Sequence, residues 1–380
     1  MKKIKVMSVF GTRPEAIKMA PVVLELNRQS ELFESIVVVT AQHREMLDQV
    51  LEIFDIVPDF DLNIMKKNQT LADITSIALQ KLDTVIKEVQ PDIVLVHGDT
   101  TTAYVAALAA FYNQVKIGHV EAGLRTWNMY SPFPEEANRQ MIDVITDLYF
   151  SPTQTSAENL LREGKDSTNI YITGNTVIDA LSETVKSDYT HEILNSIPNQ
   201  DRFILMTMHR RENLGQPMED VFSAAKEVID KDESLHLVYP VHLNPKVQES
   251  ANKIFGSHER VHLVEPLDVF DFHNIASRSL FIMSDSGGVQ EEAPSLNVPV
   301  LVLRDTTERP EGVEAGTLKL VGTKYEEVKT NMEDLLINQE VYDMMSTAKN
   351  PYGDGLASKR IIKEIANYFG ETGEDVTPFN

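Results

Sequence analysis

The chain of 380 residues carries 58 acidic and 35 basic side chains, which give it a formal net charge of −23 at pH 7. This excess of negative charge argues against a protein that mainly binds nucleic acid, because recognition of a phosphate backbone needs a basic surface. The sequence contains no cysteine, which excludes disulfide bonds and thiolate chemistry.

The length indicates two domains, each large enough to bury its own core. The N-terminal run MKKIKVMSVF is too short in its apolar part for a signal peptide. No apolar run approaches the roughly 18 residues that a membrane span needs. We therefore expect a cytoplasmic protein without a membrane segment.

Short apolar runs alternate with longer amphipathic segments in the first half of the chain. The predicted strands are 4–10, 36–40, 92–97, 116–120, 148–151 and 170–174, and the clearest predicted helices are 14–29 and 70–89. The second of these helices begins with Thr70 as N-cap and Asp73 three residues later, which is a helix-start signal. The alternation predicts a doubly wound parallel sheet.

The same alternation restarts after a predicted helix over 175–185 and a polar stretch over 186–201, which we interpret as a connection. The further predicted strands are 203–209, 235–241, 260–264, 280–284 and 298–303. We expect an α/β protein of two Rossmann-like doubly wound domains facing a cleft, over residues 1–172 and 173–356. A helix over about 357–370 should pack back on the first domain, and residues 371–380 should be a frayed tail.

Candidate anion-binding groups follow the first predicted strand. Gly11 permits a tight turn into the next helix, and Arg13 and Lys18 lie where an anion could be met. The stretch is not the GxGxxG fingerprint of dinucleotide binding. A solvated loop with two exposed cations is the alternative.

Three carboxylates fall near the carboxyl ends of strands in the first domain, namely Asp99, Glu121 and Glu135. Two of them have a structural alternative, since Asp99 could cap a helix and Glu135, like Glu136 beside it, could favour a helix dipole. Crowded carboxylates raise one another's pKa, which suits general acid–base catalysis. Their spacing does not suggest a metal site, and we expect no metal.

The second domain carries the stretch 284–317, in which Ser286, Gly287 and Gly288 open a predicted helix between two buried strands. Backbone N–H groups at such a position can bind phosphate, although an ordinary well-capped turn has the same appearance. His209 ends a predicted strand beside two arginines and suits a pyrophosphate or a proton transfer, with a structural histidine as the alternative. Phe272 could stack on a base or belong to the core.

Several motifs occur along nearly the whole chain in a fixed order: GTRPEAIKMAP, HGDTTT, HVEAGLRT, SPFPEEANR, TGNTVIDA, HRREN and SDSGGVQEEAPSLNVPVLVLRDTTERPE. Together they resemble the bacterial non-hydrolysing UDP-N-acetylglucosamine 2-epimerases. The resemblance implies a glycosyltransferase-B-like fold, a homodimer, and reversible conversion of UDP-GlcNAc to UDP-ManNAc without NAD or another cofactor. The product would supply ManNAc for cell-surface polysaccharide.

The resemblance also implies roles for residues at matching positions. The implied catalytic residues are Asp99, Glu121, Glu135 and His209, and the implied substrate-binding residues are Arg13, Lys18, Phe272, Ser286, Gly287, Gly288, Glu292 and Arg309. Some bacterial members bind a second UDP-GlcNAc as activator, and Gln42, Arg210 and His242 match that pattern. Asn68 and Glu45 stand where regulated members would carry a basic residue and a glutamine.

The residue types agree with the chemistry that the resemblance implies. The C2 hydrogen of the sugar has no adjacent carbonyl, so an anti elimination of UDP to 2-acetamidoglucal, followed by readdition, explains inversion at C2. This scheme needs carboxylates near C2 and cations on the departing diphosphate. The alternatives are a hydrolysing relative that releases ManNAc and UDP, a glycosyltransferase with this fold, and a catalytically silent UDP-sugar sensor.

Overall fold

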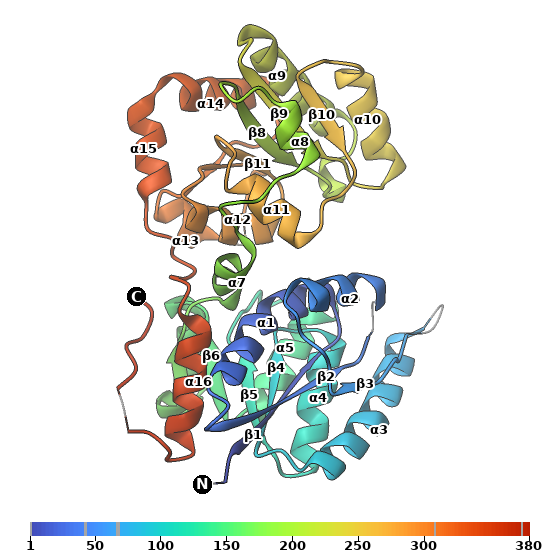
Figure 1. The fold of residues 1–380 in the computed structure, drawn as a ribbon, viewed down its shortest axis with the longest axis vertical. Coiled ribbons are helices and arrows are strands. Elements are labelled where there is room, and N and C mark those ends of the chain that lie inside the picture. The colour runs from blue at the N-terminus through green and yellow to red at the C-terminus, as the bar shows by residue number, and fades with distance from the viewer. Residues whose placement is uncertain (1, 42–43, 66–68, 308, 374) are drawn as a thin grey trace. The chain divides into compact units, whose positions relative to one another are not determined.

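The computed structural model describes residues 2–41, 44–65, 69–307, 309–373 and 375–380. It contains two fully parallel sheets (Figure 1), with strand orders β3-β2-β1-β4-β5-β6-β7 and β10-β9-β8-β11-β12-β13. The predicted α/β class with two Rossmann-like sheets is confirmed. Gln42 and Asn68 lie outside the described residues. Among the residues described, no helix is both long and apolar enough to cross a membrane.

Unit 1 comprises Met1–Glu183 and Tyr352–Asn380. Its strands are β1 (Ile4–Phe10), β2 (Phe33–Val39), β3 (Phe60–Asp61), β4 (Ile93–His97), β5 (Lys116–Val120), β6 (Leu148–Ser151) and β7 (Ile170–Ile172). Its helices are α1 (Arg13–Arg28), α2 (Arg44–Ile53), α3 (Leu71–Val89), α4 (Thr101–Tyr112), α5 (Glu135–Ile145), α6 (Gln154–Arg162), most of α7 (Thr176–Thr184), and α16 (Ala357–Tyr368). Helices α3, α4 and α5 pack side by side, and α1 packs against both α2 and α16 (Figure 1).

Unit 2 comprises Thr184–Pro351. Its strands are β8 (Arg202–Thr207), β9 (Leu235–Pro240), β10 (Val261–Val264), β11 (Ile282–Ser284), β12 (Val300–Val302) and β13 (Leu318–Leu320). Its helices are α8 (Glu192–Ser196), α9 (Gln216–Lys231), α10 (Pro245–Phe255), α11 (Val269–Ala276), α12 (Gly287–Glu292), α13 (Pro310–Glu314), α14 (Tyr325–Ile337) and α15 (Gln339–Thr347).

The central strands are continuous apolar runs because helices cover both of their faces. Every residue of β4 is buried, as are all but one of β1. These are the strands that the sequence predicts best. The two strands missing from the prediction, β3 and β13, have the sequences FD and LKL, which are too short to show an apolar run.

The start of α3 is capped as predicted. The Thr70 hydroxyl oxygen accepts a hydrogen bond from the Asp73 N–H at 3.2 Å, and the Asp73 carboxylate accepts one from the Thr70 N–H at 2.9 Å. These reciprocal bonds satisfy two N–H groups that a helix start otherwise leaves unpaired. A sequence signal of four residues therefore fixes where this helix begins.

The polar stretch over 186–201 packs on unit 2 rather than spanning freely between two domains. The Tyr189 hydroxyl donates to Asp271 at 2.6 Å, and the Lys186 N–H donates to Asn274 Oδ1 at 2.8 Å. The sequence-based boundary after residue 172 falls inside unit 1, which continues into α7. The polar composition of this stretch suggested a linker. The contacts that anchor it could not be recognised from the sequence, because their partners are distant along the chain.

The last residues of the chain also make defined contacts with unit 1, although their composition led us to expect a frayed tail. Phe379 is only 6% exposed, and its N–H donates to the Ile172 carbonyl of β7 at 2.9 Å. Helix α16 packs on α1, and the buried Asp179 carboxylate accepts from the N–H groups of Ala357 and Ser358 at the start of α16. The end of the chain thus covers the edge strand of the first sheet.

Replacing Phe379 with alanine should lower the free energy of unfolding by about 2 kcal/mol, because a buried phenylalanine contributes roughly 1.5–3 kcal/mol. Urea denaturation followed by circular dichroism measures this change. Ile337→Ala serves as the control, since that side chain is 84% exposed and its loss should cost less than about 0.5 kcal/mol. Equal effects of the two substitutions would show that the tail does not contribute to stability.

Candidate active site

The candidate carboxylates of unit 1 follow the ends of two neighbouring strands. His97 of β4 pairs with Val120 of β5 in the parallel register, so Asp99 and Glu121 come directly after the same edge of the sheet. Ligands of open parallel sheets collect at this edge, outside the carboxyl ends of the strands. The topology therefore brings two of the three predicted carboxylates to one place.

Glu121 is held by groups from two other segments. Lys18 of α1 donates from Nζ to Glu121 Oε1, and Asn175 Nδ2 donates to the same oxygen at 3.0 Å. The side chain is only 9% exposed, and the backbone has a φ of +67°, which is uncommon for a residue other than glycine. A cationic partner favours the ionised form of this largely buried carboxylate, which makes Glu121 a candidate general base.

His97, which was not among the site residues predicted from the sequence, lies beside this carboxylate. It is buried, and neither ring nitrogen has a hydrogen-bond partner in the part of the chain that the structure describes. Its Nε2 is 3.5 Å from Glu121 Oε2. Burial lowers the pKa of His97 to about 3, so the ring is neutral at pH 7. A strand-end histidine preceding Gly98-Asp99 was the available signal, but a core histidine looks the same in sequence.

The depressed pKa of His97 makes stability depend on pH. The unfolded chain takes up the proton near pH 6.5, and the folded chain does so only near pH 3, so this contribution is complete above pH 6.5 and is lost as the pH falls toward 3. Urea unfolding of the wild type and of His97→Gln should give free energies whose difference shrinks by about 2 kcal/mol between pH 6.5 and pH 5. A difference that stays constant between pH 6.5 and pH 5 would contradict this prediction.

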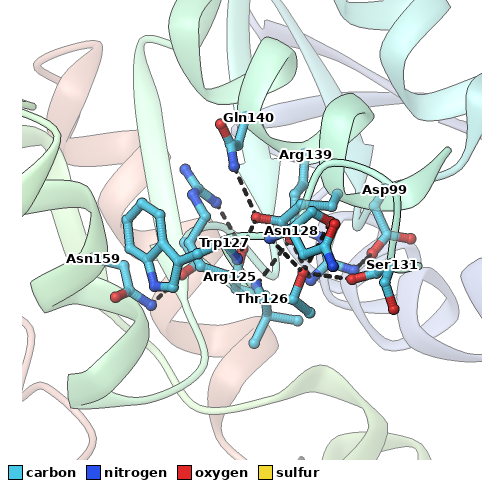
Figure 2. A network of polar contacts seen from close by, with 12 residues as sticks. Asp99, Arg125, Thr126, Trp127, Asn128, Ser131, Arg139, Gln140 and Asn159 are labelled. Atoms are coloured by element: carbon cyan, nitrogen blue, oxygen red, sulfur yellow. Dashed lines mark hydrogen bonds and ion pairs between the residues drawn. The ribbon is translucent and has the colours of Figure 1, made fainter. Parts of the chain in front are cut away.

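Asp99 belongs to a polar network that extends along the start of α5 (Figure 2). Arg139 donates from Nη2 to the Asp99 carboxylate, and Asn138 Nδ2 donates to the Asp99 carbonyl at 2.9 Å. The alternative role as a helix cap does not apply, because Thr100 is the N-cap of α4 and accepts from the Ala103 N–H at 3.0 Å. The Asp99 carboxylate is therefore not used as a helix cap, and it is paired with Arg139.

The two adjacent acids at the start of α5 have different surroundings. Glu136 is buried and accepts from the N–H groups of Thr126 and Trp127 at 2.9 and 3.0 Å, which fixes the loop before the helix. Burial alone would raise the pKa of Glu136, but these bonds and one from Gln140 hold it below its usual value. Glu135, in contrast, has a buried Oε2 without a hydrogen-bond partner among the described residues. Glu136 therefore has a structural role, whereas Glu135 keeps a carboxylate oxygen that no such bond holds within the described part of the chain.

The loop after β1 is fixed by Glu15 and presents Arg13. The Glu15 carboxylate is buried and accepts from the Gly11 and Thr12 N–H groups at 3.1 and 2.8 Å. A Cβ at Gly11 would lie 2.0 Å from Thr40 Oγ1, so no larger residue fits. Arg13 is half-buried at the start of α1 and makes no ion pair within the described part of the chain. Its charge is free for an anionic ligand.

In unit 2, the buried Asp285 holds the loop that follows β8. Its carboxylate accepts from the N–H groups of His209 and Arg210 at 3.0 and 2.9 Å and from Asn213 Nδ2 at 2.9 Å. The His209 ring then stacks on His242 with 5.4 Å between ring centroids and 9° between planes. The structure thus brings together the predicted catalytic histidine and one residue of the predicted second site.

Two arginines border the first residue of α12. A Cβ at Gly287 would lie 3.9 Å from Nη2 of Arg210 and 3.9 Å from Nη2 of Arg309. Arg309 Nε also donates to the buried Glu291. Two planar guanidinium groups beside a position without a side chain suit a diphosphate, which accepts paired hydrogen bonds. Ser286, the N-cap, makes no capping bond with its side chain.

The remaining predicted contacts of unit 2 lie next to α12. Glu292 Oε2 is 3.3 Å from Nε2 of the buried His273, and His273 Nδ1 is 2.7 Å from Thr184 Oγ1. Phe272 is half-buried against the apolar core of unit 2 and meets the His273 ring edge-to-face. Part of the Phe272 side chain therefore packs in the core of unit 2. Within the described residues, no group of three His, Asp or Glu side chains is arranged to hold a metal ion.

These features define the class of protein first: an α/β protein with the glycosyltransferase-B-like fold, with carboxylates at the edge of one sheet and arginines at the edge of the other. Residues 25–366 match the family described as UDP-N-acetylglucosamine 2-epimerase. The enzyme of that name from Bacillus subtilis (strain 168) is 60% identical over 379 residues, which cover 100% of this chain and 99% of the relative.

Solved structures agree with this relationship. A crystal structure of a UDP-N-acetylglucosamine 2-epimerase has a TM-score of 0.94 at 58% identity and covers 100% of both chains. The structure of the UDP-GlcNAc 2-epimerase from Neisseria meningitidis bound to UDP-GlcNAc has a TM-score of 0.84 at 48% identity and covers 96% of this chain and 100% of that one. The chain belongs to the UDP-N-acetylglucosamine 2-epimerase family, as its motifs predicted.

Proposed function

We propose that the protein interconverts UDP-GlcNAc and UDP-ManNAc by reversible epimerisation at C2, without hydrolysis and without a bound cofactor. The observation that carries this proposal is the group at the edge of β4 and β5, where Glu121 is paired with Lys18 beside the neutral His97. Asp99 and Glu135 complete the set of carboxylates. A glycosyltransferase or a silent sensor would have no use for several reactive carboxylates at one sheet edge.

The proposed reaction proceeds by elimination and readdition. A carboxylate removes the proton from C2, the bond between C1 and the UDP oxygen breaks, and UDP and 2-acetamidoglucal form. UDP then adds back to C1 while a second acid delivers a proton to the opposite face of C2, so that atoms and charge balance over the cycle. Two acid–base groups are needed on opposite faces, and Asp99, Glu121 and Glu135 are the candidates.

The residues of unit 2 are proposed to hold the leaving UDP. Arg309, with Ser286 and the two glycines after it, would bind the diphosphate and stabilise the charge that develops as the C1–O bond breaks. His209 would donate a hydrogen bond or a proton to the same oxygens, and Arg13 of unit 1 would add a further cation. Glu292 would accept hydrogen bonds from the ribose hydroxyls, and Phe272 would contact the base.

Proton NMR of UDP-GlcNAc incubated with the protein in deuterated buffer, without NAD, tests this proposal. We expect UDP-ManNAc to appear with deuterium at C2, and the remaining UDP-GlcNAc to become deuterated at the same carbon. Formation of UDP and free ManNAc in equal amounts would instead identify a hydrolysing enzyme. Epimerisation with retention of the original hydrogen would contradict the elimination.

Replacing Arg309 with lysine should weaken UDP binding about tenfold, because the charge remains but the paired hydrogen bonds are lost, and replacement with methionine should weaken it about 100-fold. Isothermal titration with UDP measures both. Arg202→Met is the control, since Arg202 forms an exposed ion pair with Asp232 in the same unit. Unchanged affinity in Arg309→Met would remove this residue from the diphosphate site.

We also propose that the protein is a homodimer and that it acts in the cytoplasm to supply ManNAc for cell-surface polysaccharide. A further proposal is that a second UDP-GlcNAc binds near Gln42, Arg210 and His242. Arg210 borders the same glycine as Arg309, so the second site would adjoin the diphosphate site. Activation by added UDP-GlcNAc of the reverse reaction, and its loss in His242→Ala, would support the second site. Sedimentation equilibrium tests the dimer.

A further inference from the structure

Asn175 is a buried residue whose side chain reaches the proposed catalytic carboxylate. It precedes α7 and is only 4% exposed. Its Oδ1 accepts from the Val177 N–H at 3.1 Å, and its Nδ2 donates to Glu121 Oε1 at 3.0 Å. Because a backbone N–H can only donate, the amide oxygen must face Val177, and the NH₂ group must face Glu121. The orientation of the amide is therefore fixed by its own helix start.

The backbone of Asn175 is bonded to the segment by which the chain returns to unit 1. Its N–H donates to the carbonyl of Tyr352, the first residue of that segment, at 2.7 Å. Gly353 packs directly on the same site, because a Cβ there would lie 2.8 Å from Ile178 Cγ1 and 3.4 Å from the Asn175 carbonyl oxygen. The position of residues 352–353 thus sets the position of Asn175.

We propose that Asn175 is a positioning residue for Glu121 and that it connects this carboxylate to the returning segment at 352–353. The inference rests on the proposed role of Glu121 in proton transfer. The charged or titratable groups that face the Glu121 carboxylate among the described residues are Lys18 from α1 and His97 from β4. Asn175 adds a neutral donor that favours the ionised carboxylate and fixes its rotamer. A displacement of the returning segment reaches Glu121 through two hydrogen bonds.

The decisive variant is Asn175→Asp, which keeps the acceptor for Val177 and nearly the same shape. It replaces the donor facing Glu121 with a second carboxyl oxygen, and two carboxyl oxygens at about 3 Å share a proton. We expect the titration midpoint of Glu121 to rise by at least about one pH unit. The ¹³C signal of its carboxyl carbon, assigned with Glu121→Gln, measures this in the resting protein. The apparent pKa of the acid limb in the dependence of kcat on pH should rise with this midpoint.

A matched control makes the same chemical change away from Glu121. Asn338 is the N-cap of α15 and accepts from the Val341 N–H at 3.3 Å, so Asn338→Asp changes a helix-start asparagine in unit 2. It should leave the Glu121 midpoint and the kcat profile unchanged. Should Asn175→Asp fail to fold, Asn175→Ser, whose hydroxyl can still cap α7, should lower kcat at least about tenfold with KM unchanged.

The connection to the returning segment has its own test. In Gly353→Ala the added methyl group meets Ile178, so the segment must shift although no side chain of the site is changed. We expect the Glu121 midpoint to move in this variant. Gly373→Ala is the control, because a Cβ at Gly373 meets nothing within 4 Å.

The outcomes separate the inference from the function on which it rests. If Asn175→Asp lowers only the unfolding temperature and leaves the Glu121 midpoint in place, Asn175 is merely structural and the inference is overturned. An unmoved midpoint in Gly353→Ala overturns the connection to the segment. If the midpoint moves as expected but the wild type does not epimerise UDP-GlcNAc, the proposed function fails and the positioning of Glu121 stands.

Discussion

Replacing Asp99 with asparagine should lower kcat by about 10³-fold while UDP binds with unchanged affinity. Loss of a general acid or base typically costs 10²–10⁴-fold, and the amide oxygen of asparagine can still accept the hydrogen bond from Arg139, so the network at α5 should persist. Because Thr100 and not Asp99 caps α4, the substitution should not weaken that helix. Steady-state kinetics and UDP titration measure the two quantities.

The control for Asp99→Asn is Asp343→Asn, which neutralises an exposed carboxylate on α15 and should leave kcat unchanged. Turnover at the wild-type rate in Asp99→Asn would restrict proton transfer to Glu121 and Glu135. A loss of UDP affinity equal to the loss of kcat would show that Asp99 acts in binding. Complete loss of turnover with normal binding would also exclude a silent UDP-sugar sensor, since a sensor has no turnover to lose.

Replacing Arg125 with methionine should lower the free energy of unfolding by about 3–5 kcal/mol, which is the usual cost of breaking a buried ion pair from one side. The Arg125 side chain is fully buried and donates to Asp143 and to Glu163, each at 2.7 Å. The second partner of Asp143 is His119, whose Nδ1 lies 2.6 Å from it. Burial opposes ionisation of Asp143, but His119 and Arg125 hold its pKa below the usual value. Without Arg125, the buried Asp143 carboxylate would keep only His119 of these two partners.

Urea denaturation measures this loss, and Arg202→Met is again the control, because its exposed pair with Asp232 should contribute less than about 1 kcal/mol. A domain is stabilised by only about 5–15 kcal/mol in total, so Arg125→Met should leave little reserve at 37 °C. The effect should extend to activity, since His119 Nε2 lies 2.8 Å from the carbonyl of Gly98, the residue before Asp99. A change below about 1 kcal/mol would mean that water replaces the lost partner.

The pattern of apolar runs predicted both sheets because a strand buried on two faces has an unmistakable composition. Prediction was poorer where structure depends on contacts between distant residues. The stretch 186–201 read as a linker, but Tyr189 and Lys186 anchor it to α11. The tail looked frayed, but Phe379 is buried beside β7. Neither partner can be recognised from one sequence, since nothing local to the segment requires it.

The sequence alone supplied the candidate groups, namely carboxylates after the strands of one sheet and arginines and glycines after those of the other, and it contained the motifs whose order identified the family. Only the tertiary structure decided between alternatives at each position. It made Thr100 rather than Asp99 the N-cap of α4, and it gave Glu135 and Glu136 different surroundings. It also placed His97 and Asn175 beside the Glu121 carboxylate. The reason is physical, because a side chain's identity sets what it can donate or accept, whereas burial and the partners within about 3 Å set which of those capacities remain.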